Sequence, residues 1–374
     1  MNTVIPVENG ETLVALRGFL RQLLESGAVE ALYVSLGVDN GLVAPALVTD
    51  PALLDQADPL TPVMPINGAR AVSALTGKRA PARLGVVLRP CEIRALVELV
   101  KLQQADLENV LLIGLDCPGT YELTDYVERQ KTGQANLREY LALAREGNTD
   151  SLHDMPLRHA CQMCDQPVPE HTDIHIGLFG AGAENGLPVE IDDEIAESLQ
   201  LPVVPGVLPD GRQTVVDRLV ADSRQTREKE LAAMRERLDA NGGLSGLFAT
   251  CIRCHNCMTV CPICYCKTCL FKTASFDHQP EHYLTAAKRK GATRLLGDTM
   301  LFHMTRLNHM SLSCVSCGMC TSACPADIPV GLVFSAIGAQ VQAAFDYRPG
   351  WEISETLPLI TFQPNEWTEV GETR

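Results

Sequence analysis

The 374-residue sequence predicts an α/β domain with a mostly parallel sheet, followed by a smaller α-helical domain rich in cysteine. Over the first 225 residues, short β-branched runs alternate with helical stretches, which is typical of strand–helix–strand units. Beyond them, 11 of the 15 cysteines fall between Cys251 and Cys324. Clustered thiols in a reducing compartment are metal ligands more often than disulfides, so the second domain is expected to bind metal.

Composition excludes several classes of protein. The 31 Lys and Arg residues against 46 Asp and Glu residues give a net charge of −15. That charge excludes a nucleic-acid-binding protein, which needs cations to neutralise phosphates. No apolar run approaches the roughly 18 residues of a membrane span, and the first 20 residues lack the basic and apolar blocks of a signal peptide. We therefore expect a cytoplasmic protein of two or three domains, without membrane insertion.

Three apolar runs are the best strand candidates, namely Ala31–Val38, Leu84–Leu88 and Val110–Leu115. The last is unbroken, which indicates burial on both faces, as in a parallel sheet. The clearest helix covers residues 93–102, because its apolar residues recur every three or four positions.

A charged helical stretch, residues 222–240, ends at an Asn-Gly-Gly sequence and is a plausible boundary helix. We accordingly divide the chain into four parts. They are the α/β domain (1–225), a linker helix (226–243), the helical domain (244–345) and a Pro- and Glu-rich tail (346–374) that is expected to cover a surface.

The helical domain contains an internal repeat of the pattern C-x2-C-x2-C-x3-C-P, whose copies begin at Cys251 and, 63 residues later, at Cys314. This is the ferredoxin motif for 4Fe-4S clusters, in which the fourth cysteine ligates the other cluster. One predicted ligand set is Cys251, Cys254, Cys257 and Cys324. The other is Cys314, Cys317, Cys320 and Cys261.

The alternative interpretation is zinc, whose structural sites also use C-x2-C pairs but do not call for this triple spacing. The gap between the copies is long and contains helical stretches around residues 284–289 and 295–308, which favours an α-helical ferredoxin. Three further cysteines, Cys264, Cys266 and Cys269, either ligate part of a cluster or pack beside one.

Four cysteines of the first domain form a third candidate site. Cys91 and Cys117 each follow a predicted strand, and the carboxyl ends of parallel strands share one edge of the sheet. Cys91 also begins a helix, whose dipole favours a thiolate. Cys161 and Cys164 supply a C-x2-C pair. Isolated cysteines are usually small buried hydrophobes. These four make another 4Fe-4S site if the fold brings them together.

These motifs together resemble a known family. They are Arg89-Pro-Cys-Glu-Ile-Arg-Ala-Leu, Ile113-Gly-Leu-Asp-Cys-Pro-Gly, Cys161-x-x-Cys164-Asp and Cys251-Ile-Arg-Cys-His-Asn-Cys-Met-Thr-Val-Cys-Pro. They resemble the beta-subunit family of deazaflavin-linked hydrogenase and formate dehydrogenase, in particular its formate dehydrogenase branch. The likeness covers most of residues 60–345. It implies a subunit with FAD and several 4Fe-4S clusters, which exchanges electrons with a soluble carrier while a catalytic partner oxidises the primary substrate.

A flavin fits this chemistry because clusters pass single electrons, whereas hydride carriers move two. The sequence lacks G-x-G-x-x-G, so other residues must hold the diphosphate. The candidate flavin contacts are Asn67, Gly68, Arg70, Lys78, Arg79, Arg89 and Arg94. Glycine allows close backbone approach, and the cations offset phosphate charge. The alternatives are an exposed basic loop, and pairing of Arg89 and Arg94 with Glu92 or Glu98.

The sequence thus predicts an electron-transferring beta subunit with three 4Fe-4S clusters and FAD. It leaves the catalytic residues unassigned. The carrier can be a deazaflavin coenzyme, NAD(P) or ferredoxin. A flavin-free iron–sulfur adaptor between larger redox partners is the alternative function, and a zinc-dependent scaffold is a third.

Overall fold

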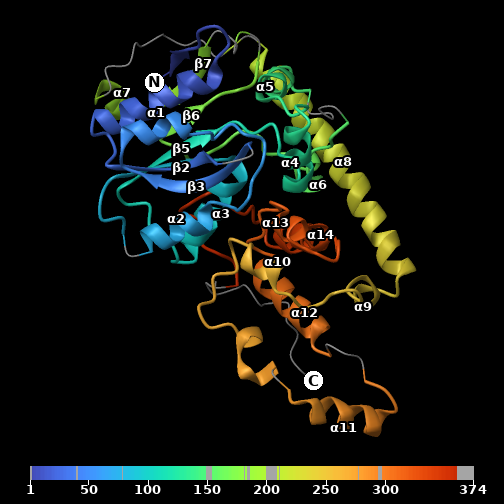
Figure 1. Ribbon diagram of the computed structural model, residues 1–374. Helices are drawn as coiled ribbons and strands as arrows, with labels where there is room; N and C mark the ends of the chain where they lie inside the picture. The colour runs from blue at the N-terminus through green and yellow to red at the C-terminus, as the bar shows by residue number, and fades with distance from the viewer. Residues whose placement is uncertain are drawn as a thin grey trace.

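The fold is that of a computed structural model, which describes residues 2–38, 41–77, 79–148, 154–180, 182, 186–198, 209, 211–276, 278–293 and 297–359. Figure 1 shows a sheet with helices on both faces, joined by a long helix to a second group of helices. The strands are β1 (Asn2–Pro6), β2 (Ala31–Val38), β3 (Leu42–Val48), β4 (Leu84–Leu88), β5 (Val110–Leu115), β6 (Ile174–Ile176) and β7 (Gly186–Ile191).

In the part of the first domain that the structure describes, seven α-helices precede the long one. They are α1 (Thr12–Glu25), α2 (Ala69–Thr76), α3 (Pro90–Lys101), α4 (Leu123–Lys131), α5 (Leu137–Arg145), α6 (His159–Gln162) and α7 (Asp193–Ser198), with a 3-10 turn η2 (Pro51–Gln56). The remaining helices are α8 (Arg212–Ala240), α9 (Leu244–Leu247), α10 (Asn256–Thr259), α11 (Pro280–Lys290), α12 (Thr299–Met310), α13 (Met319–Ser322) and α14 (Val330–Ala344), with 3-10 turns η3 (Leu270–Lys272) and η4 (Ala274–Phe276).

The sheet is parallel at its centre and antiparallel at its edges, so the predicted α/β fold with a mostly parallel sheet is confirmed in part. Its strand order is β1-β7-β6-β5-β4-β2-β3. The central strands β6, β5, β4 and β2 pair in parallel, whereas β3, β7 and β1 add antiparallel edges. The three predicted strands are confirmed with their predicted bounds. Long-range pairing decides the edges, so a local pattern did not reveal them.

Successive residues of the central strands face two different cores. On β5, Leu111 and Ile113 pack with α1, whereas Leu112 lies in the core that contains α2 and α3. The second core continues into the cysteine-rich domain through residues such as Met258 and Phe302. The two domains therefore share one apolar core on the α2–α3 face of the sheet.

Helix α8 is the predicted boundary helix, and it is longer than the sequence indicated. It ends at Ala240 as expected but begins at Arg212 rather than at residue 222. It runs along the outside of the molecule from the α5 region to α9 (Figure 1). The helix is therefore continuous across the proposed boundary at residue 225.

The described part of the cysteine-rich domain is built from short helices. The predicted stretch 284–289 lies within α11, and the stretch that was expected from Leu295 begins as α12 at Thr299. Leu295 itself lies outside the described residues. Helix α11 lies at the end of the molecule farthest from the sheet (Figure 1).

Residues after α14 pack against α3. The buried Glu98 carboxylate accepts hydrogen bonds from the Tyr347 hydroxyl at 2.5 Å and from the Gly350 N–H at 2.8 Å, and Lys101 lies 3.5 Å away. Glu98 therefore pairs with Lys101 rather than with Arg94. Residues 360–374 of the predicted tail lie outside the described residues. Among the described helices, none is long and apolar enough to cross a membrane.

Candidate metal centres

The four cysteines of the first domain line a single cavity at the carboxyl edge of the parallel strands. Cys91 lies in the first turn of α3, directly after β4, and Cys117 follows β5 by two residues. Cys161 lies on α6 and Cys164 just beyond it. The fold therefore brings together the four thiols of the predicted third site, although they are distant in sequence.

Soft sulfur donors in an enclosed site suit iron–sulfur chemistry. Burial raises the pKa of Cys117 to about 12, and the nearby Arg89 only partly opposes this effect. A free thiol would stay protonated there, whereas a coordinated metal deprotonates a thiol outright. The Thr120 hydroxyl lies 3.3 Å from the Cys161 sulfur, and the Cys117 N–H donates to the Pro167 carbonyl at 2.8 Å. The donor set and its surroundings fit a cluster.

A buried ionic network lies directly behind this site. The fully buried Asp116 carboxylate contacts His175 Nε2 at 2.9 Å and accepts hydrogen bonds from the Arg212 guanidinium, one of them at 3.0 Å. It also accepts from the Leu178 N–H at 2.7 Å. Asp116 thus ties the start of α8 to the end of β5, next to Cys117. The sequence analysis did not identify this network; the only local signal was an aspartate immediately before Cys117.

The network predicts a loss of stability at alkaline pH. Burial opposes a charged imidazolium, but hydrogen bonds to Asp116 and Glu190 outweigh it and raise the pKa of His175 from 6.5 to about 9. Because the folded pKa is the higher one, this stabilisation is complete below pH 6.5. It is lost as the pH rises to about 9, by roughly 3 kcal/mol.

Thermal unfolding of the wild type and of His175→Gln across pH 6 to 10 measures this effect. We expect the difference between the two proteins to shrink above pH 6.5. A difference that is constant with pH would show that His175 is neutral in the folded protein.

The two ferredoxin motifs have the same backbone conformation. Arg253 and Ser316, which are equivalent in the repeat, have φ of 55° and 57°, and His255 and Gly318 have φ of 63° and 73°. Each motif then forms a one-turn helix, α10 or α13. Left-handed conformations of non-glycine residues cost energy and cluster at functional sites. The sequence repeat is thus a repeat of one strained loop that carries three thiols.

The crossed ligand pairing has support from two sets of observations. One cavity is lined by Cys251, Cys254 and Cys257 of the first motif and by Cys324 of the second. In the second group, burial raises the pKa of Cys314 to about 12, and the thiols of Cys261 and Cys317 add to this shift. Each motif therefore places its fourth cysteine near thiols of the other motif.

Two residues of α12 contact cysteines of the first predicted ligand set, and neither was among the residues predicted for a site. His303 Nε2 lies 3.3 Å from the Cys251 sulfur, although the sequence indicated no metal-related role for this histidine. Burial, and then the charge of Arg306, lowers the pKa of His303 to about 4, so its ring is neutral. Arg306 donates to the Cys257 sulfur at 3.1 Å. Their spacing of three residues on a helix with buried apolar neighbours was the available signal.

Arg158 connects the second motif to the cavity of the first domain. Its guanidinium donates to the Cys317 carbonyl and the Ser322 hydroxyl, both at 3.1 Å, and it lines the four-thiol cavity together with Cys317. The α6 backbone packs so closely there that a Cβ at Gly318 would lie 2.2 Å from Ala160 Cβ. The second predicted ligand set therefore adjoins the four-thiol cavity of the first domain through Cys317.

The candidate flavin contacts separate into two places. Arg89 and Arg94 line the four-thiol cavity, and Arg89 donates to the Thr61 carbonyl at 2.6 Å. The Gly68 N–H donates to Glu92 at 2.7 Å, Arg70 donates to the Thr259 carbonyl at 2.5 Å, and Arg79 pairs with Glu108 at 2.5 Å. Gly68, Arg70 and Arg79 therefore each have a partner within the protein, although the contacts of Arg70 and Arg79 are exposed to solvent.

Two other candidates keep a buried donor atom without a partner among the described residues. These atoms are Asn67 Nδ2 and Arg94 Nε. Lys78 lies outside the described residues. Of these two residues, Arg94 is the one that lies at the thiol cavity, where its buried N–H can meet a flavin.

The three additional cysteines lie apart from both cavities. Cys266 is exposed, and the Cys269 sulfur lies 3.7 Å from the Met258 sulfur. Neither of these residues nor Cys264 lines the cavities described above. Within the described ranges, no group of three or more His, Cys, Asp or Glu side chains is arranged to hold a single metal ion.

Comparison with known families first defines the class of protein. Residues 247–328 match the family model described as a 4Fe-4S dicluster domain, so the cysteine-rich part is an iron–sulfur domain. Residues 82–194 match the family model for the C terminus of the coenzyme F420 hydrogenase/dehydrogenase beta subunit. The first domain is thus similar to the C terminus of that beta subunit, the cysteine-rich part is similar to a dicluster domain, and the resemblance expected from the motifs is confirmed.

Two curated relatives span nearly the whole chain. The F420-dependent formate dehydrogenase subunit beta of Methanocaldococcus jannaschii is 24% identical, over 92% of this chain and 96% of the relative. The F420-dependent formate dehydrogenase 1 subunit beta of Methanococcus maripaludis is 26% identical, over 92% of both chains. A chain of the F420-reducing [NiFe] hydrogenase complex from Methanosarcina barkeri aligns at a TM-score of 0.42 and 14% identity, over 62% of this chain and 92% of that chain.

Proposed function

We propose that this chain is the electron-transferring beta subunit of a formate dehydrogenase or hydrogenase complex, which passes electrons between a catalytic partner and a soluble carrier. The observation that carries this proposal is the position of Cys317, a second-motif cysteine that lines the four-thiol cavity of the first domain. Electron transfer needs redox centres placed close together, and this contact joins the two domains at the thiol groups themselves.

Three 4Fe-4S clusters complete the proposal, and each would supply one-electron chemistry when bound. The first would be held by Cys251, Cys254, Cys257 and Cys324, the second by Cys314, Cys317, Cys320 and Cys261, and the third by Cys91, Cys117, Cys161 and Cys164. The protein itself excludes water and holds the loops. His303 and Arg306 support the first ligand set, and Arg158 holds the second against the third.

FAD would couple one-electron centres to a two-electron carrier. Arg94 supports this part of the proposal, because it lines the thiol cavity with a buried N–H that has no partner in the described part of the chain. For the carrier we propose coenzyme F420, since the names of both curated relatives include it. A flavin-free adaptor is the second candidate function, favoured by the protein contacts that occupy Gly68, Arg70 and Arg79.

Analysis of the anaerobically purified protein tests the proposal. We expect about twelve irons per chain by the count of four per cluster, equal acid-labile sulfide, an extractable flavin and reduction of coenzyme F420 by the dithionite-reduced protein. The same iron content without flavin or F420 reduction would establish the adaptor instead. Zinc without sulfide would overturn both functions.

A further inference from the structure

Arg306 is a buried cation without a carboxylate partner. Its exposed fraction is 3%, and in the part of the chain that the structure describes no Asp or Glu lies within 4 Å of its guanidinium. It donates to the Cys257 sulfur at 3.1 Å and to the Cys257 carbonyl at 3.0 Å. The rings of Phe302 and Phe334 lie 5.5 Å and 4.9 Å from its central carbon.

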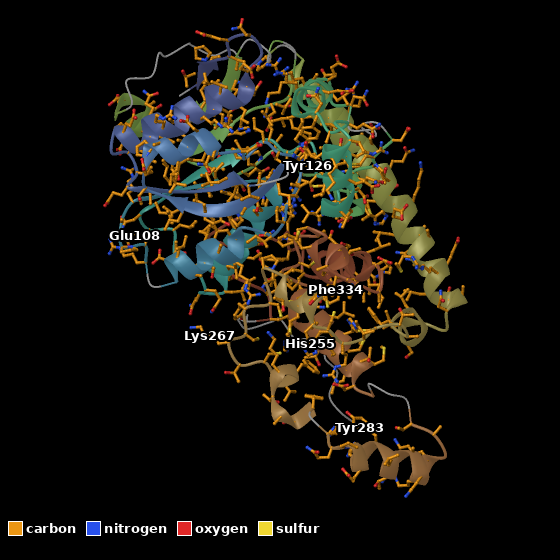
Figure 2. All side chains as sticks on the ribbon, in the orientation of Figure 1. Glu108, Tyr126, His255, Lys267, Tyr283 and Phe334 are labelled. Carbon is orange, nitrogen blue, oxygen red and sulfur yellow. The ribbon has the colours of Figure 1, made fainter. Side chains whose placement is uncertain are left out.

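Figure 2 shows Phe334, which lies on α14, above His255 of the first motif loop. Both phenylalanines beside Arg306 are buried, so its guanidinium lies in an apolar surrounding. A lone charge in such a place costs several kcal/mol unless an opposite charge offsets it. The aromatic faces supply only a small part of that compensation. The anionic groups that remain are cysteine sulfurs.

The sulfur that the guanidinium contacts belongs to the first predicted ligand set. Cys257 accepts hydrogen bonds from Arg306 through both its sulfur and its carbonyl oxygen. The positive charge is therefore placed where it acts directly on the first cluster.

We propose that Arg306 is a positioning residue of the first ferredoxin cluster, the one that Cys257 would ligate, and that its permanent positive charge favours the reduced state of that cluster. This inference rests on the cluster ligation proposed above. A cluster with four thiolate ligands is an anion, and it gains one more negative charge when it accepts one electron; no bond forms or breaks. A cation that is hydrogen-bonded to a ligand sulfur stabilises the more negative state, and most strongly where water is excluded.

A second arginine, Arg253, shows that a position near a predicted cluster does not by itself give an arginine this role. It belongs to the loop of the first motif, but its guanidinium pairs with Asp298 and its charge is therefore offset locally. Only its backbone N–H donates to the Cys251 sulfur, at 3.4 Å. Arg306 combines burial, a direct bond to a ligand sulfur and an uncompensated charge.

Redox titration followed by electron paramagnetic resonance (EPR) on the anaerobic full-length protein tests the inference. Arg306→Gln keeps hydrogen-bond donors but loses the charge. At a fixed potential we expect the ratio of reduced to oxidised cluster to fall at least tenfold for the first ferredoxin cluster, which is about 59 mV for a one-electron couple. Arg306→Lys, which keeps the charge, should stay within tenfold of the wild type. Arg289→Gln, an exposed arginine on α11, is the matched control and should cause no shift.

The inference would be overturned if the Arg306→Gln protein had full iron content and wild-type potentials, or if only the potential of the second ferredoxin cluster shifted. If the Arg306→Gln protein does not retain iron, the Arg306→Lys protein serves as the test. A change of tenfold or more in its ratio of reduced to oxidised cluster, despite the retained charge, would contradict a charge effect. Wild-type protein without iron would instead remove the proposed function. The two failures are thus distinguishable.

Discussion

Replacing Cys324 by serine is expected to abolish the cluster whose three other ligands belong to the first motif. Cys324 lies in the second motif, but it lines the cavity of Cys251, Cys254 and Cys257. Loss of one ligand set should lower the iron content from about twelve to about eight per chain, by the count of four per cluster. Iron and sulfide analysis measures this loss, and transfer of electrons to a soluble carrier should fall with it.

EPR spectra of three variants identify which cluster is lost. Cys324→Ser and Cys251→Ser should lose the same signal, whereas Cys314→Ser should lose a different one. Cys266→Ser is the matched control, because this exposed thiol lines neither cavity, and its iron content should equal that of the wild type. If Cys324→Ser shared its lost signal with Cys314→Ser, each motif would bind its own cluster and the crossed pairing would be wrong.

Asp116→Asn is expected to cause the largest loss of stability among the substitutions considered, about 3–5 kcal/mol, the range for breaking a buried ion pair. The substitution leaves Arg212 buried without its counter-charge and weakens the contact with His175. It also removes the strong acceptor for the Leu178 N–H. Because Asp116 precedes Cys117, we expect weaker iron retention at the four-thiol cavity as well.

The thermal unfolding midpoint of the anaerobic protein measures the effect. Asp55→Asn is the matched control, since Asp55 also pairs with an arginine, Arg21 at 2.5 Å, but its side chain is 76% exposed. Exposed pairs contribute at most about 1 kcal/mol. Equal midpoints for Asp116→Asn and Asp55→Asn would show that the Asp116 network does not stabilise the fold.

Strand prediction succeeded where the pattern was local. The three best candidate strands match β2, β4 and β5, because buried parallel strands are short, continuous apolar runs. The antiparallel edge strands depend on pairing between segments that are distant in sequence, since β1 pairs with β7 across almost the whole first domain. Strand β6 has three residues, too few to show a period, and β3 contains Pro45, which a local pattern assigns to an edge at best.

Cysteine spacing by itself determined the two ferredoxin motifs, because each three-thiol loop is encoded within about a dozen consecutive residues whose backbone conformation is local. The family resemblance also followed from contiguous motifs. Only the tertiary structure decided that Cys91, Cys117, Cys161 and Cys164 share a cavity, and that His303 and Arg306 reach the first motif. It also decided which of the candidate flavin contacts have hydrogen-bond or ion-pair partners within the protein. These features depend on segments that are distant along the chain, and burial, which gives a charge or a thiol its chemistry, exists only once those segments have packed.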